Sequence, residues 1–133
     1  WIIIDPLTSV EAAAAAMEMV DQTLGKRPVT GLIYSHSHGD HFGGAKGVID
    51  PADAAARKVP VIAPEGFMEE ATSENVMAGG AMMRRAAFQF GTGLAPGATG
   101  QMGSGIGMGL SSGTLSLIAP TDTVAKTGET RVV

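Results

Sequence analysis

The sequence contains no cysteine, which excludes disulfide bonds and thiolate metal ligands. Lysine and arginine number 9 against 13 aspartates and glutamates, so the formal net charge is −4. With this balance and no basic run, we expect no nucleic-acid partner and no anionic membrane surface. No apolar run reaches the roughly 20 residues that a membrane-spanning helix needs. The 133 residues, 44% of them hydrophobic, suffice for one modest core.

The two ends of the chain both fall in strand-like apolar runs. The sequence opens on Trp1, without a methionine, and stops on Val132 and Val133. We therefore expect residues 1–133 to be a piece of a longer protein, and of a single domain within it.

A strand, a helix and a second strand are predicted in the first 35 residues. Residues 1–5 (WIIID) and 29–35 (VTGLIYS) are apolar runs typical of buried strands. The alanine-rich residues 9–24 between them predict a helix, because alanine has the highest helix propensity. This order predicts an α/β fold, in which sites gather at the carboxyl edge of the sheet.

Local signals mark both ends of that helix. Thr8 and Glu11, three residues apart, form the pattern of a capping box. Gly25 is expected to end the helix at its C-terminus.

Further elements are predicted downstream. They are a short helix over 42–49, a strand over 59–63, a helical stretch over 67–90 interrupted at Gly79-Gly80, and strands over 114–119 and 130–133. The glycine pair 43–44 permits either close backbone packing or room for substrate, and we favour packing.

Residues 91–113 form a segment dense in glycine. It lacks the GxxxxGK[ST] pattern of a phosphate-binding loop, and its glycines match looser patterns by chance. Four apolar side chains indicate a loop packed on other residues: Met102, Ile106, Met108 and Leu110. We predict an ordered, extended loop that borders the active site.

All three histidines lie in residues 36–41, which read HSHGDH and directly follow a predicted strand. Imidazole and carboxylate are ligands that Zn²⁺ prefers. His36 and His38 are two residues apart, so in extended backbone both rings point to one side. After a turn at Gly39, Asp40 and His41 would point to a neighbouring position. We expect one pair of ligands for each of two ions, rather than a solvated loop in which histidines cluster by chance.

This HxHxDH loop, with the strand and helix before it, resembles the metallo-β-lactamase superfamily. Three further stretches are similar to the alkyl sulfatases of that superfamily: APEGFMEEATSENVMAGGAMMRRAAFQFG, GQMGSGIGMG and TLSLIAPT. The resemblance covers nearly the whole chain. Many relatives have alanine where Gly39 stands here, a small change that need not disturb metal binding.

The resemblance implies a fold and a chemistry. The fold would be an αββα sandwich, of which residues 1–133 form an incomplete catalytic domain with residues 91–113 as its glycine-rich loop. The activity would be zinc-dependent hydrolysis of alkyl sulfates such as dodecyl sulfate, in a homodimer with further domains downstream. His36 and His38 would bind the first zinc ion, and Asp40 and His41 the second. We also assign Asp40 a catalytic role.

The family completes its site with two glutamates and a further histidine, and this chain has no histidine outside 36–41. Glu129 is the only glutamate after Glu74, and we do not assign it to the site. Each zinc ion would have only two protein ligands here, whereas zinc sites normally have three or four. We therefore expect the isolated chain to bind zinc weakly and to be nearly inactive.

The helical stretch 67–90 offers further candidates. Met77, Met82 and Phe88 could line a pocket for an alkyl chain, but we favour packing on the sheet. For Arg84 and Arg85 we favour solvated or salt-bridged roles over sulfate binding, because adjacent helical positions face different ways. The spacing of Glu74 and Asn75 assigns them no chemistry.

Two other functions stay open. The first is another hydrolase of the superfamily, acting on a lactam, lactone or thioester. The second is a non-catalytic metal-binding or interaction module that has kept the loop. Because alkyl sulfates meet the cell from outside, we expect a periplasmic or secreted location.

Overall fold

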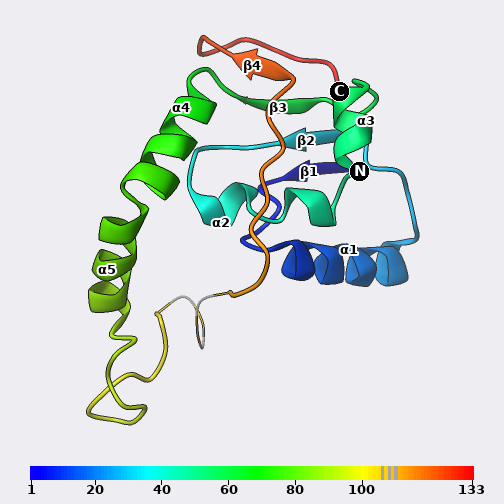
Figure 1. Ribbon diagram of the computed structural model, residues 1–133. Coiled ribbons are helices and arrows are strands. Elements are labelled where there is room, and N and C mark those ends of the chain that lie inside the picture. The colour runs from blue at the N-terminus through cyan, green and yellow to red at the C-terminus, as the bar shows by residue number, and fades with distance from the viewer. Residues whose placement is uncertain (106, 108, 110) are drawn as a thin grey trace.

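The computed structural model describes residues 1–105, 107, 109 and 111–133. Its centre is a four-stranded sheet in which every neighbouring pair is parallel, in the order β1-β2-β3-β4 (Figure 1). The strands are β1 (Ile2–Ile4), β2 (Gly31–Ile33), β3 (Val61–Pro64) and β4 (Asp122–Val124). The predicted α/β class is confirmed.

Helices connect the parallel strands, as such sheets require. In chain order they are α1 (Val10–Leu24), α2 (Gly39–Phe42), a 3₁₀ turn (Ala45–Gly47), α3 (Pro51–Ala55), α4 (Phe67–Thr72), a π-helical turn (Ser73–Met77) and α5 (Gly79–Phe90). The helix predicted over 9–24 is confirmed, and Gly25 follows it with a φ of 84°. Among the described residues, no helix has the length and apolar character to cross a bilayer.

The start of α1 differs from the predicted capping box. Ser9, not Thr8, caps the helix, and its hydroxyl accepts a hydrogen bond of 3.2 Å from the Ala12 amide. Glu11 instead accepts hydrogen bonds from the amide and the hydroxyl of Thr114, at 2.8 and 2.7 Å. The expected box was wrong because a tertiary contact takes the carboxylate that it would have used.

The core beneath the histidine loop is a cluster of three buried aromatic rings. Tyr34 stacks on Phe67 with ring centroids 5.0 Å apart, and Phe42 meets Phe67 edge-on at 5.8 Å. The Tyr34 hydroxyl donates a 3.1 Å hydrogen bond to the Ile118 carbonyl, and burial raises the pKa of this phenol. Tyr34 and Phe42 flank the histidine motif, so both ends of that loop are anchored in the core.

The glycine pair after the histidines serves close packing, as predicted. A Cβ on Gly43 would collide with the Thr8 carbonyl, and one on Gly44 with the Pro6 carbonyl. The chain between β1 and α1 therefore passes directly against the backbone that leaves the histidine loop.

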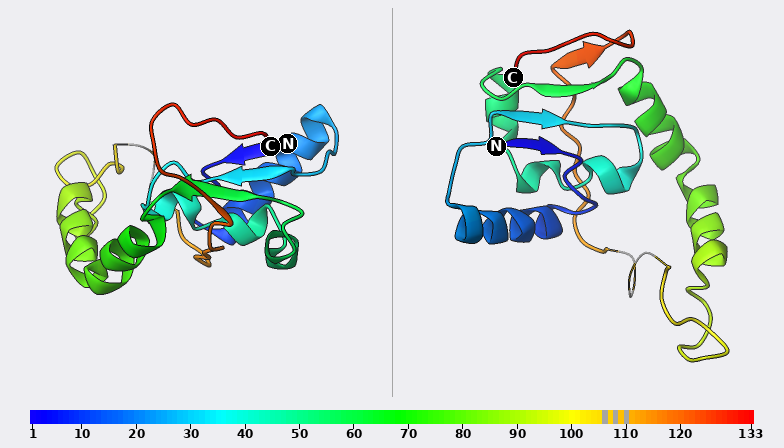
Figure 2. Two further views of the ribbon diagram at one scale, coloured as in Figure 1. Left: turned by 90° about the horizontal axis from the view of Figure 1, so that it is seen from above. Right: turned by 180° about the vertical axis from the view of Figure 1, so that it is seen from behind.

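The strand predicted over 114–119 was wrong. In this segment Ser116 forms a single parallel β-bridge to Gly44, and the Thr114 carbonyl accepts a 2.9 Å hydrogen bond from the Val10 amide at the start of α1. The Ser116 hydroxyl also donates to the Gly43 carbonyl at 2.8 Å and accepts from the Lys46 amide at 3.1 Å. The segment crosses the sheet on its way to β4 (Figures 1 and 2). The hydrogen bonds of Ser116 to the backbone that follows α2 hold it in this direction. Residues 130–133, also predicted as a strand, form none.

The helical stretch predicted over 67–90 is confirmed, but its interruption lies earlier than Gly79-Gly80: the π-helical turn and Ala78 break the helix, and both glycines lie in the first turn of α5. Helices α4 and α5 project away from the sheet in every view (Figures 1 and 2), and α5 has no buried residue. Met77 and Phe88 are 82% and 92% exposed, and Met82 is also exposed, so their expected packing on the sheet is wrong. Arg84 and Arg85 are exposed, in accord with the solvated role expected of them.

The glycine-rich loop lies beyond α5. The Gln101 side chain donates a 2.9 Å hydrogen bond to the Phe90 carbonyl, which ties the loop to the end of that helix. Met102 is 75% exposed, so it does not pack as expected. The same expectation for Ile106, Met108 and Leu110 falls outside the described residues.

Candidate metal centre

The histidine loop lies at the carboxyl edge of the parallel sheet, where the sequence placed it. It follows β2, and α2 begins inside the motif at Gly39. His38 is in extended backbone just before that helix, with φ −72° and ψ 139°. Asp40 and His41 lie in the helix itself. The change from extended to helical backbone turns the second pair of side chains back toward the first pair.

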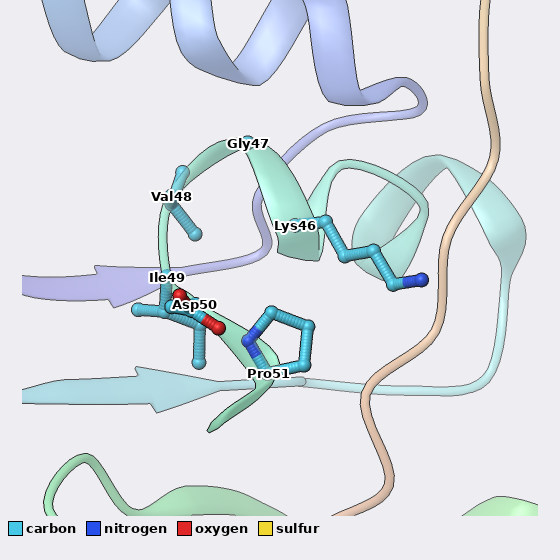
Figure 3. A pocket seen from close by; sticks show the side chains of 6 residues that line it. All are labelled: Lys46, Gly47, Val48, Ile49, Asp50 and Pro51. Atoms are coloured by element: carbon cyan, nitrogen blue, oxygen red, sulfur yellow. The ribbon is translucent and has the colours of Figure 1, made fainter. Parts of the chain in front are cut away.

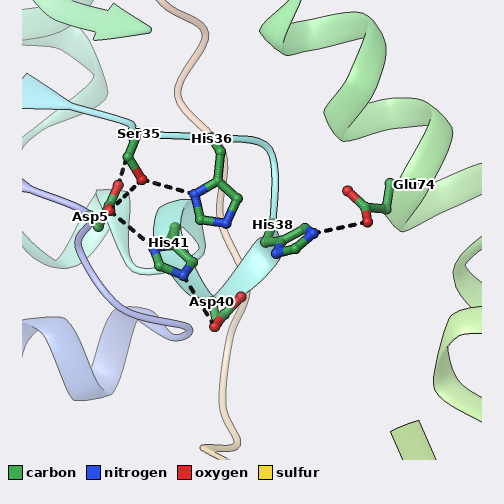
Figure 4. A network of polar contacts seen from close by, with 7 residues as sticks. All are labelled: Asp5, Ser35, His36, His38, Asp40, His41 and Glu74. Atoms are coloured by element: carbon green, nitrogen blue, oxygen red, sulfur yellow. Dashed lines mark hydrogen bonds and ion pairs between the residues drawn. The ribbon is translucent and has the colours of Figure 1, made fainter. Parts of the chain in front are cut away.

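The structure brings the three imidazoles together (Figure 4). The ring centroids of His36 and His38 are 4.5 Å apart, and those of His36 and His41 are 4.0 Å apart. Asp40 joins them through a contact of 3.4 Å between its Oδ2 and Nε2 of His41. The four side chains predicted as ligands therefore lie close to one another, but the described group whose ligand atoms all lie within 4.8 Å of each other is Asp5, His36 and His41, without His38 and Asp40.

Each ring has a nitrogen held by a neighbouring protein group, and Nε2 of His41 also lies 3.4 Å from Asp40. His36 Nδ1 lies 2.9 Å from the Ser35 hydroxyl, His41 Nδ1 lies 3.0 Å from an Asp5 oxygen, and His38 Nε2 lies 3.1 Å from a Glu74 oxygen. A neutral imidazole that donates to a carboxylate from one nitrogen has its lone pair on the other. The nitrogens that remain for a ligand are Nε2 of His36, Nδ1 of His38 and Nε2 of His41.

Asp5 is a site residue that the sequence analysis missed. Its two carboxylate oxygens accept hydrogen bonds from the Ser35 amide at 2.8 Å, the Ser35 hydroxyl at 2.6 Å and His41 Nδ1 at 3.0 Å. Burial acts to raise the pKa of Asp5, but these hydrogen bonds together outweigh it and hold that pKa below its ordinary value. Asp5 is thus ionised at neutral pH and links β1 to the histidine loop.

The backbone of Asp5 is also unusual. Its φ is 54°, in the left-handed region that few residues other than glycine adopt, although aspartate tolerates it. Such strain tends to persist where surrounding contacts demand it, often at functional sites. The sequence showed only that Asp5 ends the first predicted strand; the pairing of β1 with β2, which brings Asp5 to the histidine loop, is visible in the structure alone.

The donor set fits a metal ion. Asp5, His36 and His41 each offer a ligand atom, and these atoms lie within 4.8 Å of one another. Both Asp5 oxygens already accept hydrogen bonds, so we assign Asp5 to the support of His41 rather than to ligation. Imidazole nitrogens are ligands that zinc and similar divalent cations prefer.

Glu74 and Asn75 are further residues that the sequence analysis left without a role. Both lie in the π-helical turn between α4 and α5. The Asn75 amide donates to the carbonyls of Ser37 and Ala71, at 3.0 and 2.8 Å. Insertions of this kind are rare and often occur at functional sites. The turn therefore attaches the helical arm, which consists of α4, the π-helical turn and α5, to the histidine loop.

A separate cavity of about 440 Å³ is lined by residues of the 3₁₀ turn and of the chain that leads from it into α3 (Figure 3). Its lining is Lys46, Gly47, Val48, Ile49, Asp50 and Pro51. None of the three imidazoles contributes to it, so it is not part of the candidate metal centre.

The chain was compared with known protein families and curated sequences. Residues 1–131 match the metallo-beta-lactamase superfamily. A linear primary-alkylsulfatase from Pseudomonas sp. is 52% identical over 98% of this chain and 19% of its own length. The (R)-specific secondary-alkylsulfatase from Pseudomonas sp. is 46% identical over 99% of the chain and 20% of its own length. An alkyl/aryl-sulfatase of Saccharomyces cerevisiae is 43% identical over 99% of the chain.

A solved structure gives the same result. The stereoselective inverting sec-alkylsulfatase from Pseudomonas sp. superimposes with a TM-score of 0.89 at 45% identity, over 99% of this chain and 21% of its own. The resemblance to alkyl sulfatases is confirmed by these matches. The chain spans about a fifth of the length of the relatives it matches.

Proposed function

The chain belongs to the metallo-β-lactamase superfamily, and from this premise we propose that the full-length protein hydrolyses alkyl sulfate esters, such as dodecyl sulfate, to an alcohol and inorganic sulfate. One observation carries the proposal: the identity of 52% to a primary alkylsulfatase extends over 98% of this chain, the histidine loop included. Sulfate-ester hydrolysis is the activity that the names of the matched relatives share.

The proposal includes two zinc ions. His36 and His38 would hold the first, and Asp40 and His41 the second, with ligands from outside this chain completing each site. The close approach of the three rings supports this assignment. Bound zinc would supply Lewis acidity, which promotes the ionisation of water near neutral pH and neutralises the charge of a sulfate group.

The neighbouring residues of this chain would position and orient the metal-binding side chains. Asp5 and Ser35 hold the rings of His41 and His36, and the aromatic cluster fixes both ends of the loop. The Asp40 side chain is 61% exposed and lies beside His41, so its carboxylate is open to a water molecule or substrate. We propose on this basis that Asp40 takes part in catalysis as well as in metal binding.

Two further proposals concern the whole protein. We propose that it is a homodimer and that it acts in the periplasm or outside the cell. The supporting argument for location is chemical, because an anionic, amphiphilic sulfate ester reaches a cell from outside.

Substrate choice tests the proposed function. The purified full-length protein would be assayed for sulfate release from dodecyl sulfate and for hydrolysis of a chromogenic β-lactam, a lactone and a thioester. We expect turnover of the sulfate ester, and its loss when His36 and His38 are both replaced by alanine. Lys26→Ala, an exposed substitution distant from the loop in sequence, is the matched control and should leave the rate unchanged. Turnover of only the lactam, lactone or thioester would contradict the proposed substrate.

The same double variant addresses a non-catalytic role. If the chain were only an interaction module, a partner should still bind after both rings are removed. Absence of hydrolysis on all four substrates by a metal-loaded protein would favour that alternative.

A further inference from the structure

A carboxylate from the helical arm reaches the middle histidine of the loop. Glu74 Oε1 lies 3.1 Å from His38 Nε2, and the side chains of His38 and Glu74 are 54% and 27% exposed (Figure 4). The other oxygen, Oε2, accepts a hydrogen bond of 3.3 Å from the Ser37 hydroxyl. Glu74 thus contacts two successive residues of the loop.

The backbone around Glu74 is fixed to the same loop. The neighbouring Asn75 donates one hydrogen bond to the Ser37 carbonyl and another to Ala71, one turn back. The π-helical turn changes the direction in which the side chains of 73–77 leave the helix, and thereby presents both Glu74 and Asn75 to the loop. Three hydrogen bonds and ion pairs between the turn and residues 37–38 result.

We propose that Glu74 is a positioning residue that holds the His38 ring at its Nε2 and so fixes the orientation of that ring toward the metal. The inference rests on the proposed metal site and deepens it. Oε1 of Glu74 lies 3.1 Å from Nε2 of His38, so this carboxylate favours a proton on Nε2 and leaves the lone pair of the ring on Nδ1. His36 and His41 are held at Nδ1 instead, and they present Nε2. The loop therefore uses two kinds of imidazole nitrogen, and a different neighbour selects each one.

This role has a measurable energetic consequence. A carboxylate that holds the second nitrogen of a metal-binding histidine fixes the ring and raises its basicity, and its removal typically weakens metal binding about 10- to 100-fold. An exposed ion pair without such a role contributes little or nothing. Metal affinity therefore distinguishes positioning from a simple surface contact.

The test uses the full-length protein with three substitutions: Glu74→Ala, Glu74→Gln and Glu70→Gln. Zinc affinity would be measured by competition with a chromophoric chelator, and cobalt(II) would replace zinc to report ligand geometry by its visible spectrum. We expect Glu74→Ala to bind zinc about 10- to 100-fold more weakly and to alter the cobalt spectrum. Glu74→Gln keeps an oxygen acceptor and should recover part of the affinity.

Glu70→Gln is the matched control. Glu70 lies one helical turn before Glu74, is exposed, and forms no side-chain hydrogen bond or ion pair within the part of the chain that the structure describes. Its substitution removes the same charge one turn away from Glu74, and should leave zinc affinity and the cobalt spectrum unchanged.

The protonated nitrogen of His38 can also be identified directly in the wild-type protein. Nitrogen-15 NMR of the metal-free protein should show His38 protonated at Nε2. A His38 protonated at Nδ1, or a Glu74→Ala variant with wild-type zinc affinity, would overturn the positioning role while leaving sulfate hydrolysis intact. A wild-type protein that binds no zinc would overturn the proposed metal site itself, which separates the two failures.

Discussion

Replacing Gly44 by alanine should destabilise the fold through steric collision alone. Gly44 has a φ of −89°, which alanine adopts readily, so backbone conformation adds no penalty. A Cβ at this position would lie 2.6 Å from the Ala13 Cβ and 2.7 Å from the Ser9 carbonyl, and would also collide with the Pro6 carbonyl.

The size of the effect follows from what must move. Ordinary contacts of a Cβ begin at 3.4 Å, and two of the three colliding atoms belong to backbone that cannot rotate away. Overpacking of this kind lowers the free energy of unfolding by about 1 to 3 kcal/mol. With a urea dependence of about 1 to 3 kcal/mol per molar, the unfolding midpoint should fall by about 1 M.

Urea unfolding of the 133-residue chain, followed by circular dichroism, would measure this shift. Gly93→Ala is the control, because nothing lies within 4 Å of its added Cβ, and its free energy of unfolding should change by less than about 0.5 kcal/mol. A Gly44→Ala variant as stable as the Gly93→Ala variant would refute the close-packing argument and would favour open space for substrate instead.

Three further predictions concern a buried hydrogen bond, a pH-dependent surface contact and zinc binding by the isolated chain. Tyr34→Phe removes the donor to the buried Ile118 carbonyl and should lower the free energy of unfolding by about 1 to 3 kcal/mol, measured by urea unfolding. Glu11→Gln should speed amide hydrogen exchange at Thr114 at pH 7. The hydrogen bond from the Thr114 hydroxyl lowers the pKa of Glu11 in the folded chain. The interaction with Thr114 therefore contributes its full stability above the ordinary glutamate pKa of about 4.3, and this stability is lost as the pH falls through the lower pKa of the folded chain. Below that pKa, the wild-type protein and the variant should exchange the Thr114 amide at the same rate. Calorimetric titration of the isolated chain should show weak zinc binding, and tight binding of two equivalents would contradict the expected lack of ligands.

The features predictable from sequence are those that short segments specify by themselves. The helix over 9–24 follows from alanine content, and the position of the histidine loop follows from the apolar run before it. The loop needed no tertiary information either, because its ligand residues lie within six positions.

The features that sequence could not reveal depend on contacts between distant segments. Asp5 joins the site because β1 pairs in parallel with β2, and Glu74 joins it because a π-helical turn redirects its side chain. Neither the pairing of β1 with β2 nor the π-helical turn produces a recognisable hydrophobic pattern in the sequence. Strand β4 contains two polar residues and a single valine, so its pairing with β3, rather than its composition, makes it a strand.

The segment 114–119 has the sequence pattern of a strand but does not form one. Its apolar alternation is typical of a strand, but Ser116 bonds to the Gly43 carbonyl and the Lys46 amide and draws the chain across the sheet. Local pattern and tertiary hydrogen bonding compete there, and the hydrogen bonding decides the outcome.

We propose that His36, His38, Asp40 and His41 hold a pair of metal ions. A crystal structure of the zinc-loaded full-length protein, with anomalous data collected on both sides of the zinc absorption edge, would locate these ions. We expect two zinc peaks, one bonded to His36 Nε2 and His38 Nδ1, the other to Asp40 and His41 Nε2. Anomalous maps without a peak beside these four side chains would contradict it.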